Sequence, residues 1–543
     1  MIHQHPFIRI TTSFALGIAL GYYYPNGWIA VVCFCICLIL SILHRTKRYR
    51  HQEWLSGLSL SLAICALGIF AWITYPNPYC KELPKPGYYH AVLLQDAVEK
   101  PKTYQCIAHL TDTAGMQYKT ILYIQKDSLA STLIEGSQIN LYIKSTQEQT
   151  FSYYNKKNIY SSAYIPKQNW QLKTQPNSTH FIAYARLTKQ HLLQTLKQHT
   201  DSNSYALTAA ITLGQKSSLQ GVTKQYFAAS GASHLLAVSG LHVGIIFMAI
   251  SLLLQPFKRH KNIQKWGQVV VILLLWMYAF LCGLPPSIIR AVIMFSIGAL
   301  GIITQQKSYG INNVCFTAFM MLLYNPNYLF DLGFQLSFSA VIGILLYVEG
   351  RRSKVARQCK VSTEASLLGY AEPKPDFMSK ANNDQCKVSA ASKKTNRLLT
   401  WIKDMCGVSI AAQLATLPLI LYYFGTFPTY FLLTNLLMIP LGTLLVYACL
   451  LLFLISPIGI GSWLYYPIKI LSDSMQVVTQ SICRLPYAQL TDLHIGLFQV
   501  ACLYALLLGF YRFYQRPTPQ KLNAMLVCVV VWLCDDVFSS LIV

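Results

Sequence analysis

Long apolar runs separated by short polar segments make up most of the 543-residue chain. An α-helix needs about 20 apolar residues to cross a bilayer. We therefore predict membrane-spanning helices both before residue 76 and after residue 230. Their ranges are 8–24, 28–43, 55–75, 235–254, 266–284, 287–303, 314–324, 329–348, 401–424, 430–455, 463–485, 495–514 and 522–541.

Two of these runs are weaker than the others. The run at 314–324 is short, so it is expected to be tilted or to begin nearer Asn312. The run at 463–485 contains Lys469 and Asp473. Its crossing is favoured by the positive-inside rule, because Arg512 then lies on the cytoplasmic side with the other basic loops.

Between residues 85 and 173 the pattern changes to short runs in which apolar and polar residues alternate, which is typical of strands. The predicted strands are 88–99, 104–112, 117–125, 138–144 and 158–165. Five short strands suit a small barrel of the OB type, and another small β-barrel fits equally well. We place this β-domain outside the cytoplasm.

The segment 178–230 has helical spacing but too few apolar residues to span a membrane. Residues 180–199 predict an amphipathic helix on the membrane surface. Two shorter helices are predicted at 205–213 and 218–230.

Composition changes the picture by fixing the class of protein. The chain is 54% hydrophobic and only 12% charged, with a mean hydropathy of +0.38, whereas soluble domains are about 25% charged. The predicted fold is a polytopic α-helical membrane protein with a small extracytoplasmic OB-like β-barrel domain. Its expected parts are N-terminal transmembrane helices (1–76), the β-domain (77–177), interfacial helices (178–230) and a transmembrane channel domain (231–543).

Two further segments were judged by composition. Residues 350–398 are rich in Ser, Lys, Asn and Ala and predict a disordered cytoplasmic loop. The first apolar run has no small-residue cleavage site after it, so we interpret it as a retained helix.

The chain carries 44 Lys and Arg against 20 Asp and Glu, a net charge of +24. One interpretation is that basic residues collect in cytoplasmic loops. The other is an affinity for polyanions. Charge alone favours the first.

Most of the 16 cysteines lie in apolar runs, where they act as small hydrophobic residues. Cys80 and Cys106 differ, because both fall in the predicted extracytoplasmic domain. A disulfide between them is one option, and a pair of free thiols is the other.

The run that begins near residue 230 carries polar groups that lipid-facing helices do not need. His234 and His242 are eight residues apart with no Asp or Glu between them. We therefore expect hydrogen bonds between helices or a polar path, and no metal site. Glycines in this run allow a helix break, which exposes backbone N–H groups that suit phosphates. Ser239 lacks the surrounding glycines of a nucleophile elbow.

Arg290, Asp331 and Gln335 are polar residues near the starts of predicted spans. Ionisable groups inside membranes are functional candidates. One interpretation is an Arg290–Asp331 ion pair that holds two helices together. The other is that these side chains line a permeation path, and the two are compatible.

The β-domain combines lysines with tyrosines. Such a surface suits single-stranded nucleic acid, because cations contact phosphates and aromatic rings stack on bases. Tyrosine is also a good strand former and sits at membrane interfaces. The candidate DNA-binding residues are Lys100, Lys102, Tyr104, Lys119, Tyr123, Lys144 and Tyr154.

An ordered series of motifs runs through the second half of the chain. It comprises residues 214–219, 230–244, 284–291, 331–340, 413–418, 424–425 and 435–437. In this order the motifs resemble those of the ComEC-type competence proteins. The resemblance covers residues 205–440, and more loosely the first 200 residues. It implies a bacterial inner-membrane (cytoplasmic-membrane) channel for uptake of single-stranded DNA during natural transformation.

The resemblance also implies partners. Beyond single-stranded DNA and the lipid bilayer, these are an outer DNA receptor and a cytosolic helicase-like motor. Many family members carry a C-terminal metallo-β-lactamase-like domain, but its H-x-H-x-D-H motif does not occur in this sequence, and neither does a Walker motif. We therefore expect a form without that domain, no enzymatic activity, no cofactor and no metal.

Two other functions fit the same residues. The first is transport of another anionic polymer or a small anion. The second is intramembrane hydrolysis at Ser239 or at the histidines, which the missing motif makes the weaker alternative.

Overall fold

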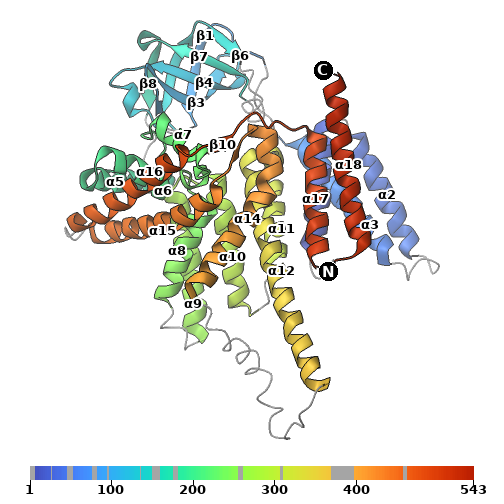
Figure 1. The fold of residues 1–543 in the computed structure, drawn as a ribbon. Coiled ribbons are helices and arrows are strands. Elements are labelled where there is room, and N and C mark those ends of the chain that lie inside the picture. The colour runs from blue at the N-terminus through green and yellow to red at the C-terminus, as the bar shows by residue number, and fades with distance from the viewer. Residues whose placement is uncertain are drawn as a thin grey trace. The chain divides into compact units, whose positions relative to one another are not determined.

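The computed structural model describes residues 6–542, apart from 26, 46–52, 76–81, 95–96, 135, 149–158, 175–180, 255–260, 306–309, 369–396, 457–460 and 516. The chain forms two compact units, and its helices and strands can be followed in chain order by colour in Figure 1. The first contains residues 1–227, 233–335 and 441–477. The second contains residues 228–232, 336–440 and 478–543.

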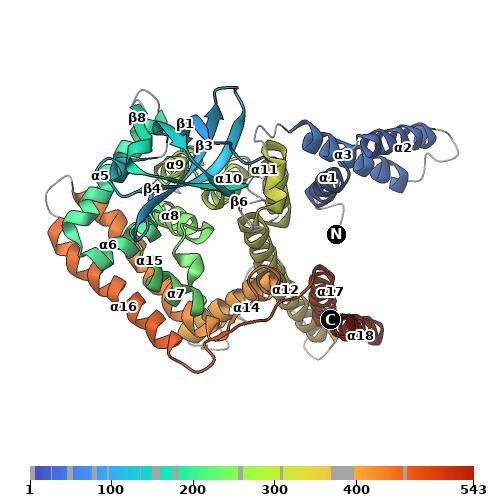
Figure 2. The same cartoon turned by 90° about the horizontal axis from the view of Figure 1, so that it is seen from above.

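The first unit begins with three apolar helices, α1 (Pro6–Tyr23), α2 (Trp28–Arg45) and α3 (Glu53–Thr74). Helix α3 packs against both others and lies between them (Figure 2). Gly17 and Gly68 let α1 and α3 approach closely, because a Cβ on either residue would overlap the backbone of the facing helix. Helix α1 also contacts α11 (Gly310–Tyr324), where Thr11 Oγ1 donates a 2.7 Å hydrogen bond to the carbonyl of Cys315.

The β-domain follows as one sheet. Its strands are β1 (Gly87–Leu93), β2 (Val98–Glu99), β3 (Thr103–Asp112), β4 (Gln117–Gln125), β5 (Gln138–Ile143), β6 (Thr146–Glu148), β7 (Ser161–Ile165) and β8 (Trp170–Thr174). The five predicted strands are present, the first of them divided into β1 and β2. The sequence prediction missed β6 and β8, which contain three and five residues.

This sheet does not show the predicted OB-like barrel, because its described pairings do not close on themselves. Its order is β6-β7-β4-β3-β1-β5-β8, with β2 paired to β3, and no pair joins β6 to β8 among the described strands. The two edge strands are too short to continue the ladder around a full circle. One face is a core of apolar side chains, including Ala91, Leu110, Leu122 and Ile139, which are at most 1% exposed.

Short helices connect the β-domain to the membrane helices. They are α5 (Phe181–His199), α6 (Ser202–Leu213) and α7 (Gly221–Ala229), close to the three predicted ranges. The first unit continues with α8 (Gly240–Leu253), α9 (Lys261–Leu281), α10 (Pro286–Ile303) and α11.

The predicted span 235–254 is broken at its start. Residues Ser233–Leu235 form a 3-10 turn, and α8 begins only at Gly240. Ser239 has an extended backbone (φ −115°, ψ 172°) and is the N-cap of α8. The remaining helix therefore has 14 residues. The sequence analysis expected that glycines allow a helix break in this run, and the break lies between the 3-10 turn and Gly240.

Helices and two short strands from the second half of the chain make up most of the second unit. Helix α12 (Leu332–Leu368) enters it from the first unit, followed by α14 (Arg397–Phe424), and α15 (Phe431–Ile455) starts in it. Strands β9 (Phe427–Pro428) and β10 (Gln489–Leu490) pair antiparallel. Helix α16 (Tyr465–Cys483) ends in this unit, and α17 (Leu497–Gln515) and α18 (Pro519–Ile542) pack together.

Helix α12 extends beyond its predicted span. It continues to Leu368, so a helix covers the first part of the segment 350–398 that was predicted to be disordered. Ala, Arg, Lys, Gln and Leu are good helix formers, and they are frequent between residues 351 and 368. Residues 369–396 lie outside the described part of the chain.

Seven of the described helices are long and apolar enough to cross a membrane, namely α3, α9, α10, α12, α14, α15 and α17. Helices α2, α8, α11 and α18 contain shorter apolar segments. The chain is therefore a multi-pass membrane protein. Helix α16 is in neither group because Lys469 and Asp473 lower its hydropathy, so its crossing of the membrane stays a prediction.

Candidate functional site

The starts of helices α8, α10 and α12 lie close together in the first unit. Ser287, near the start of α10, donates a 2.9 Å hydrogen bond from Oγ to the carbonyl of Val238, just before α8. Arg290 Nη2 donates a 3.0 Å hydrogen bond to the carbonyl of Gly333 in the first turn of α12. The starts of α8, α10 and α12 are thereby tied together. We call Ser239, His242, Ser287, Arg290 and Asp331 the helix-start cluster.

The start of α8 is capped by its own third residue. Ser239 donates its backbone N–H to Nδ1 of His242 at 3.0 Å, and its Oγ lies 3.1 Å from the same nitrogen. Because Nδ1 accepts the amide hydrogen, it carries no proton itself. His242 is 1% exposed. The Ser239–His242 contact is thus a helix cap.

Arg290 and Asp331 occupy neighbouring positions but serve different helix starts. Arg290 is 3% exposed and reaches the backbone of α12. Asp331 Oδ1 accepts the backbone N–H of Phe334 at 3.0 Å, which caps α12. Gln335 Nε2 donates to the carbonyl of Leu329 at 2.9 Å. The predicted pair is therefore brought to one site, where each polar group bonds to backbone.

The remaining predicted residue of this region, His234, lies on the 3-10 turn before α8 and is exposed. The sequence analysis missed Ser287, which links α10 to the segment before α8. It also missed Leu284, whose φ of 52° places a leucine in the left-handed region. Both residues belong to the motif at 284–291, so the motif itself was the available signal.

The helix-start cluster concentrates positive potential. The N-terminus of a helix carries a partial positive charge and unpaired N–H groups, and it is a general site for anions. Arg290 adds a full charge at the same place. Asp331 offsets part of this potential at α12, but α8 and α10 begin with neutral caps, Ser239 and Pro285. Chemically, the arrangement suits transient contact with a phosphate.

The motif at 214–219 is anchored to α9. Gly214 ends α6 with a φ of +73°, a conformation that favours glycine. Just before it, the carbonyl of Thr212 accepts a 2.8 Å hydrogen bond from Tyr278 Oη of α9. This buried contact fixes the exit of α6.

In the β-domain the predicted DNA-binding residues separate into groups. Lys100 and Lys102 are exposed in the turn between β2 and β3. Lys119 and Tyr123 point from β4 to the face opposite the core, and Lys144 is exposed just after β5. Tyr104 instead packs against the core, and Tyr154 lies outside the described residues.

The same outer face carries three tyrosines that were not among the candidates. Tyr164 of β7 pairs in register with Tyr123 and is 53% exposed. Tyr88 is 73% exposed, and its ring lies 4.9 Å from that of Tyr142. Strand register identifies these residues, and single-strand periodicity alone could not.

Cys106 lies in the core of the β-domain with a free thiol at 2% exposure. Burial raises the pKa of this thiol to about 12. Cys80 lies outside the described residues, so its pairing with Cys106 stays a prediction.

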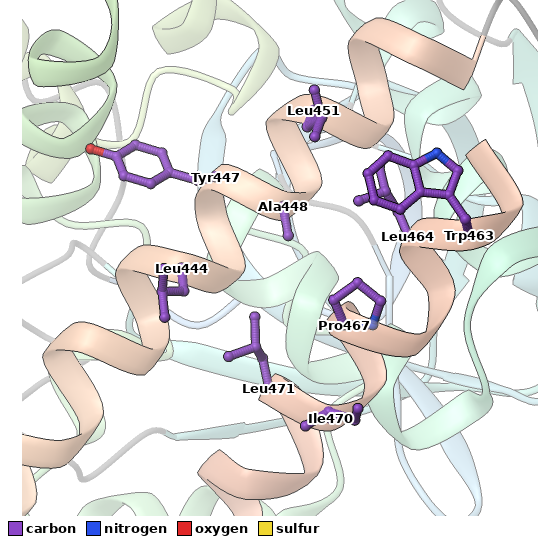
Figure 3. A pocket seen from close by; sticks show the side chains of 9 residues that line it. All are labelled: Leu444, Tyr447, Ala448, Leu451, Trp463, Leu464, Pro467, Ile470 and Leu471. Carbon is purple, nitrogen blue, oxygen red and sulfur yellow. The ribbon is translucent and has the colours of Figure 1, made fainter. Parts of the chain in front are cut away.

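A cavity of about 550 Å³ lies between α15 and α16 (Figure 3). Its lining is almost entirely apolar. The residues are Leu444, Tyr447, Ala448, Leu451, Trp463, Leu464, Pro467, Ile470 and Leu471. Tyr447 Oη donates to the carbonyl of Ile245 at 3.4 Å. A lining of this kind does not suit an anion, unlike the helix-start cluster.

Comparison with known proteins agrees with the motifs. ComE operon protein 3 of Bacillus subtilis (strain 168) is 26% identical over 255 residues, which cover 47% of this chain and 27% of that protein. An uncharacterized protein of Aquifex aeolicus (strain VF5) is 29% identical over 197 residues, covering 36% of this chain and 43% of that protein. The chain thus spans less than half the length of either curated relative. No solved structure matches it.

A family model described as competence protein matches residues 211–517. This range contains α8 to α17 and every residue of the helix-start cluster. Since it covers more than half of the chain, and the ComEC-type motifs lie within it in order, the chain belongs to the competence protein family.

Proposed function

We propose that the protein is a channel through which single-stranded DNA crosses the bacterial inner membrane during natural transformation. The observation that carries this proposal is the convergence of three helix starts on a buried arginine, inside the region matched by the competence family.

The physical case begins with the cost of moving a polyanion through hydrocarbon. A phosphate cannot be desolvated there without compensation, so the strand needs donors and cations along its route. Arg290 and the N-termini of α8 and α10 supply both. Contacts must also be weak and repeated, because a strand that binds too tightly at one position stops moving.

The β-domain supports a receiving step on the outer side of the membrane. Lys119 and Tyr123 share its outer face with Tyr164, which combines a cation for phosphates with rings for bases. We propose that an outer DNA receptor delivers the strand and that a cytosolic helicase-like motor pulls it. The channel itself carries out no hydrolysis in this scheme.

The experiment follows labelled DNA into the cytoplasm of competent cells that carry wild type, a deletion or Arg290→Ala. DNA outside the cytoplasm is removed with nuclease, and membrane abundance is measured for each strain. Truncating a buried, hydrogen-bonded charge costs about 2–5 kcal/mol, so uptake should fall at least about 30-fold. Arg512→Ala, an exposed arginine on α17, is the matched control and should leave uptake unchanged.

Normal DNA import in the deletion strain contradicts the proposal. The same cells then need to be tested with other anions, because the helix-start cluster suits any phosphate-bearing substrate. Import that is lost in the deletion but normal in Arg290→Ala keeps the channel and removes Arg290 from its route.

A further inference from the structure

The turn after α16 holds one tyrosine in an unfavourable backbone conformation. Tyr487 has a φ of 54°, in the left-handed region that bulky residues rarely adopt. Its side chain is 82% exposed, so core packing does not force it there. Backbone strain of this kind persists only where surrounding contacts impose it, and it concentrates at functional positions.

The contacts that impose it come from two adjacent residues before α15. Thr429 Oγ1 donates to the carbonyl of Tyr487 at 2.6 Å, and its backbone N–H donates to the carbonyl of Ala488 at 3.1 Å. Tyr430 Oη donates to the carbonyl of Pro486 at 3.2 Å. Residues 429 and 430 therefore hold three consecutive carbonyl groups in place, and the pairing of β9 with β10 holds the residues that follow. The backbone that carries the exposed ring of Tyr487 is thus fixed.

The ribbon formed by β9 and β10 also contacts the start of the motif at 230–244. Gly231 has a φ of +84°, and a Cβ there would lie 3.1 Å from the side chain of Pro428 in β9. Pro428 pairs with Gln489, two residues after Tyr487. All of these residues belong to the second unit. Tyr487 is thus attached to a segment that the family motifs single out.

Both polar and apolar side chains are exposed around Tyr487, the apolar ones being Leu485, Leu490 and Leu493. Arg484 is exposed three residues earlier in the same turn, and Thr491, Asp492 and His494 are exposed after it. A tyrosine that only anchors a protein at the lipid interface needs an exposed ring but no constrained backbone. A ring on a fixed backbone, three residues from a cation, suits base stacking, because little backbone freedom is then lost on contact.

We propose that Tyr487 is a stacking platform for one base of a single DNA strand and that Arg484 contacts a neighbouring phosphate. This inference rests on the proposed function, since it assigns a new contact to the strand that the channel carries. It adds a site in the second unit that is separate in sequence from the helix-start cluster.

Three variants of the full-length chain test the platform in cells, with uptake normalised to membrane abundance. Tyr487→Phe keeps the ring and should transport normally. Tyr487→Gly removes the ring and also relieves the backbone strain, so the fold is retained. Tyr487→Ala removes the ring alone. Loss of one stacked base should slow uptake about tenfold in both ring-less variants. Tyr184→Ala, at an exposed tyrosine of α5, is the matched control and should be silent.

A second measurement remains decisive if a variant fails to accumulate. The purified full-length protein in detergent is irradiated with a single-stranded oligonucleotide that contains 5-bromodeoxyuridine, and the adduct is mapped by mass spectrometry. An adduct at Tyr487 supports the platform. Its absence overturns the inference and leaves Tyr487 as an interfacial anchor. If deletion of the whole protein leaves DNA uptake intact, the proposed function itself fails.

Discussion

The β-domain and the helix-start cluster use polar side chains in opposite ways. In the β-domain the core is apolar, and Lys119 and Tyr123 project from the other face, outside that core. In the helix-start cluster the structure itself depends on polar residues. Ser239, His242 and Arg290 each form a hydrogen bond that satisfies a backbone group at the start of a helix. Function can therefore be removed from the β-domain residue by residue, whereas the cluster couples function to stability.

The sharpest test of this contrast is His242→Ala. The substitution removes the acceptor for the Ser239 amide and empties a site that is 1% exposed. An unsatisfied buried donor costs about 1–3 kcal/mol, and lost packing adds to this. The unfolding midpoint in detergent and DNA uptake should both fall. His242→Asn, whose side-chain oxygen can accept the same amide, should recover part of the stability. An unchanged unfolding midpoint in His242→Ala would show that this cap does not stabilise the protein.

Ser239→Ala should have a smaller effect of the same kind. Loss of an N-cap side chain costs about 1 kcal/mol, roughly a fivefold change in an equilibrium. Ser239→Asp restores a cap and should restore stability. Its uptake then reports on charge, since a carboxylate at the start of α8 opposes the passage of phosphates. Full loss of uptake in a stable Ser239→Ala protein would instead revive the hydrolase alternative.

In the β-domain, Tyr123→Ala should weaken binding of single-stranded DNA by the full-length protein at least about fivefold, because one stacking contact is worth about 1–3 kcal/mol. Lys119→Ala should reduce the salt dependence of binding. Either change should lower the unfolding midpoint less than the loss of a side chain that packs on the core. Tyr104→Ala, by contrast, should destabilise the domain, because Tyr104 packs against the core. Equal destabilisation by Tyr123→Ala would erase the distinction between the two faces.

The smallest expected effect concerns the reactivity of the Cys106 thiol. Because burial raises the pKa of the Cys106 thiol from 9.0 to about 12, the folded β-domain keeps this proton at pH 8 and should resist alkylation until denaturant is added. Above pH 9 the unfolded chain loses this proton and the folded chain keeps it, so stability falls as the pH rises towards 12. Cys106→Ala should flatten that decline. Rapid alkylation of native protein at pH 8, mapped to Cys106, would show that the core opens.

The contrast also separates what the sequence predicts from what it does not. Alternation along 117–125 predicts β4 at its observed bounds, because one face of the strand is buried. The short edge strands β6 and β8 carry too few residues to show a period, and sheet closure depends on pairings between distant strands. In the membrane region, apolar length predicts where the helices lie but not where α8 begins.

For the polar residues of the site, the sequence predicted the residues but not their hydrogen-bond partners. Composition and position identified Arg290, Asp331 and His242 as candidates. The partners of these residues are backbone atoms, namely the carbonyl of Gly333 and the amides of Phe334 and Ser239. Backbone partners leave no trace in residue identity, so an ion pair was the natural but incomplete expectation.

The bond between α1 and α11 sets an order of events during synthesis. Thr11 and Cys315 are 304 residues apart, so the hydroxyl of Thr11 waits for its acceptor while the intervening chain is made. At about 5–20 residues per second this takes roughly 15–60 s. During that time α1 can already pack against its near neighbour α3, through the close contact at Gly17 and Gly68. We therefore expect the N-terminal helices to pack together early, and α1 to dock onto α11 only after residue 315 has been made.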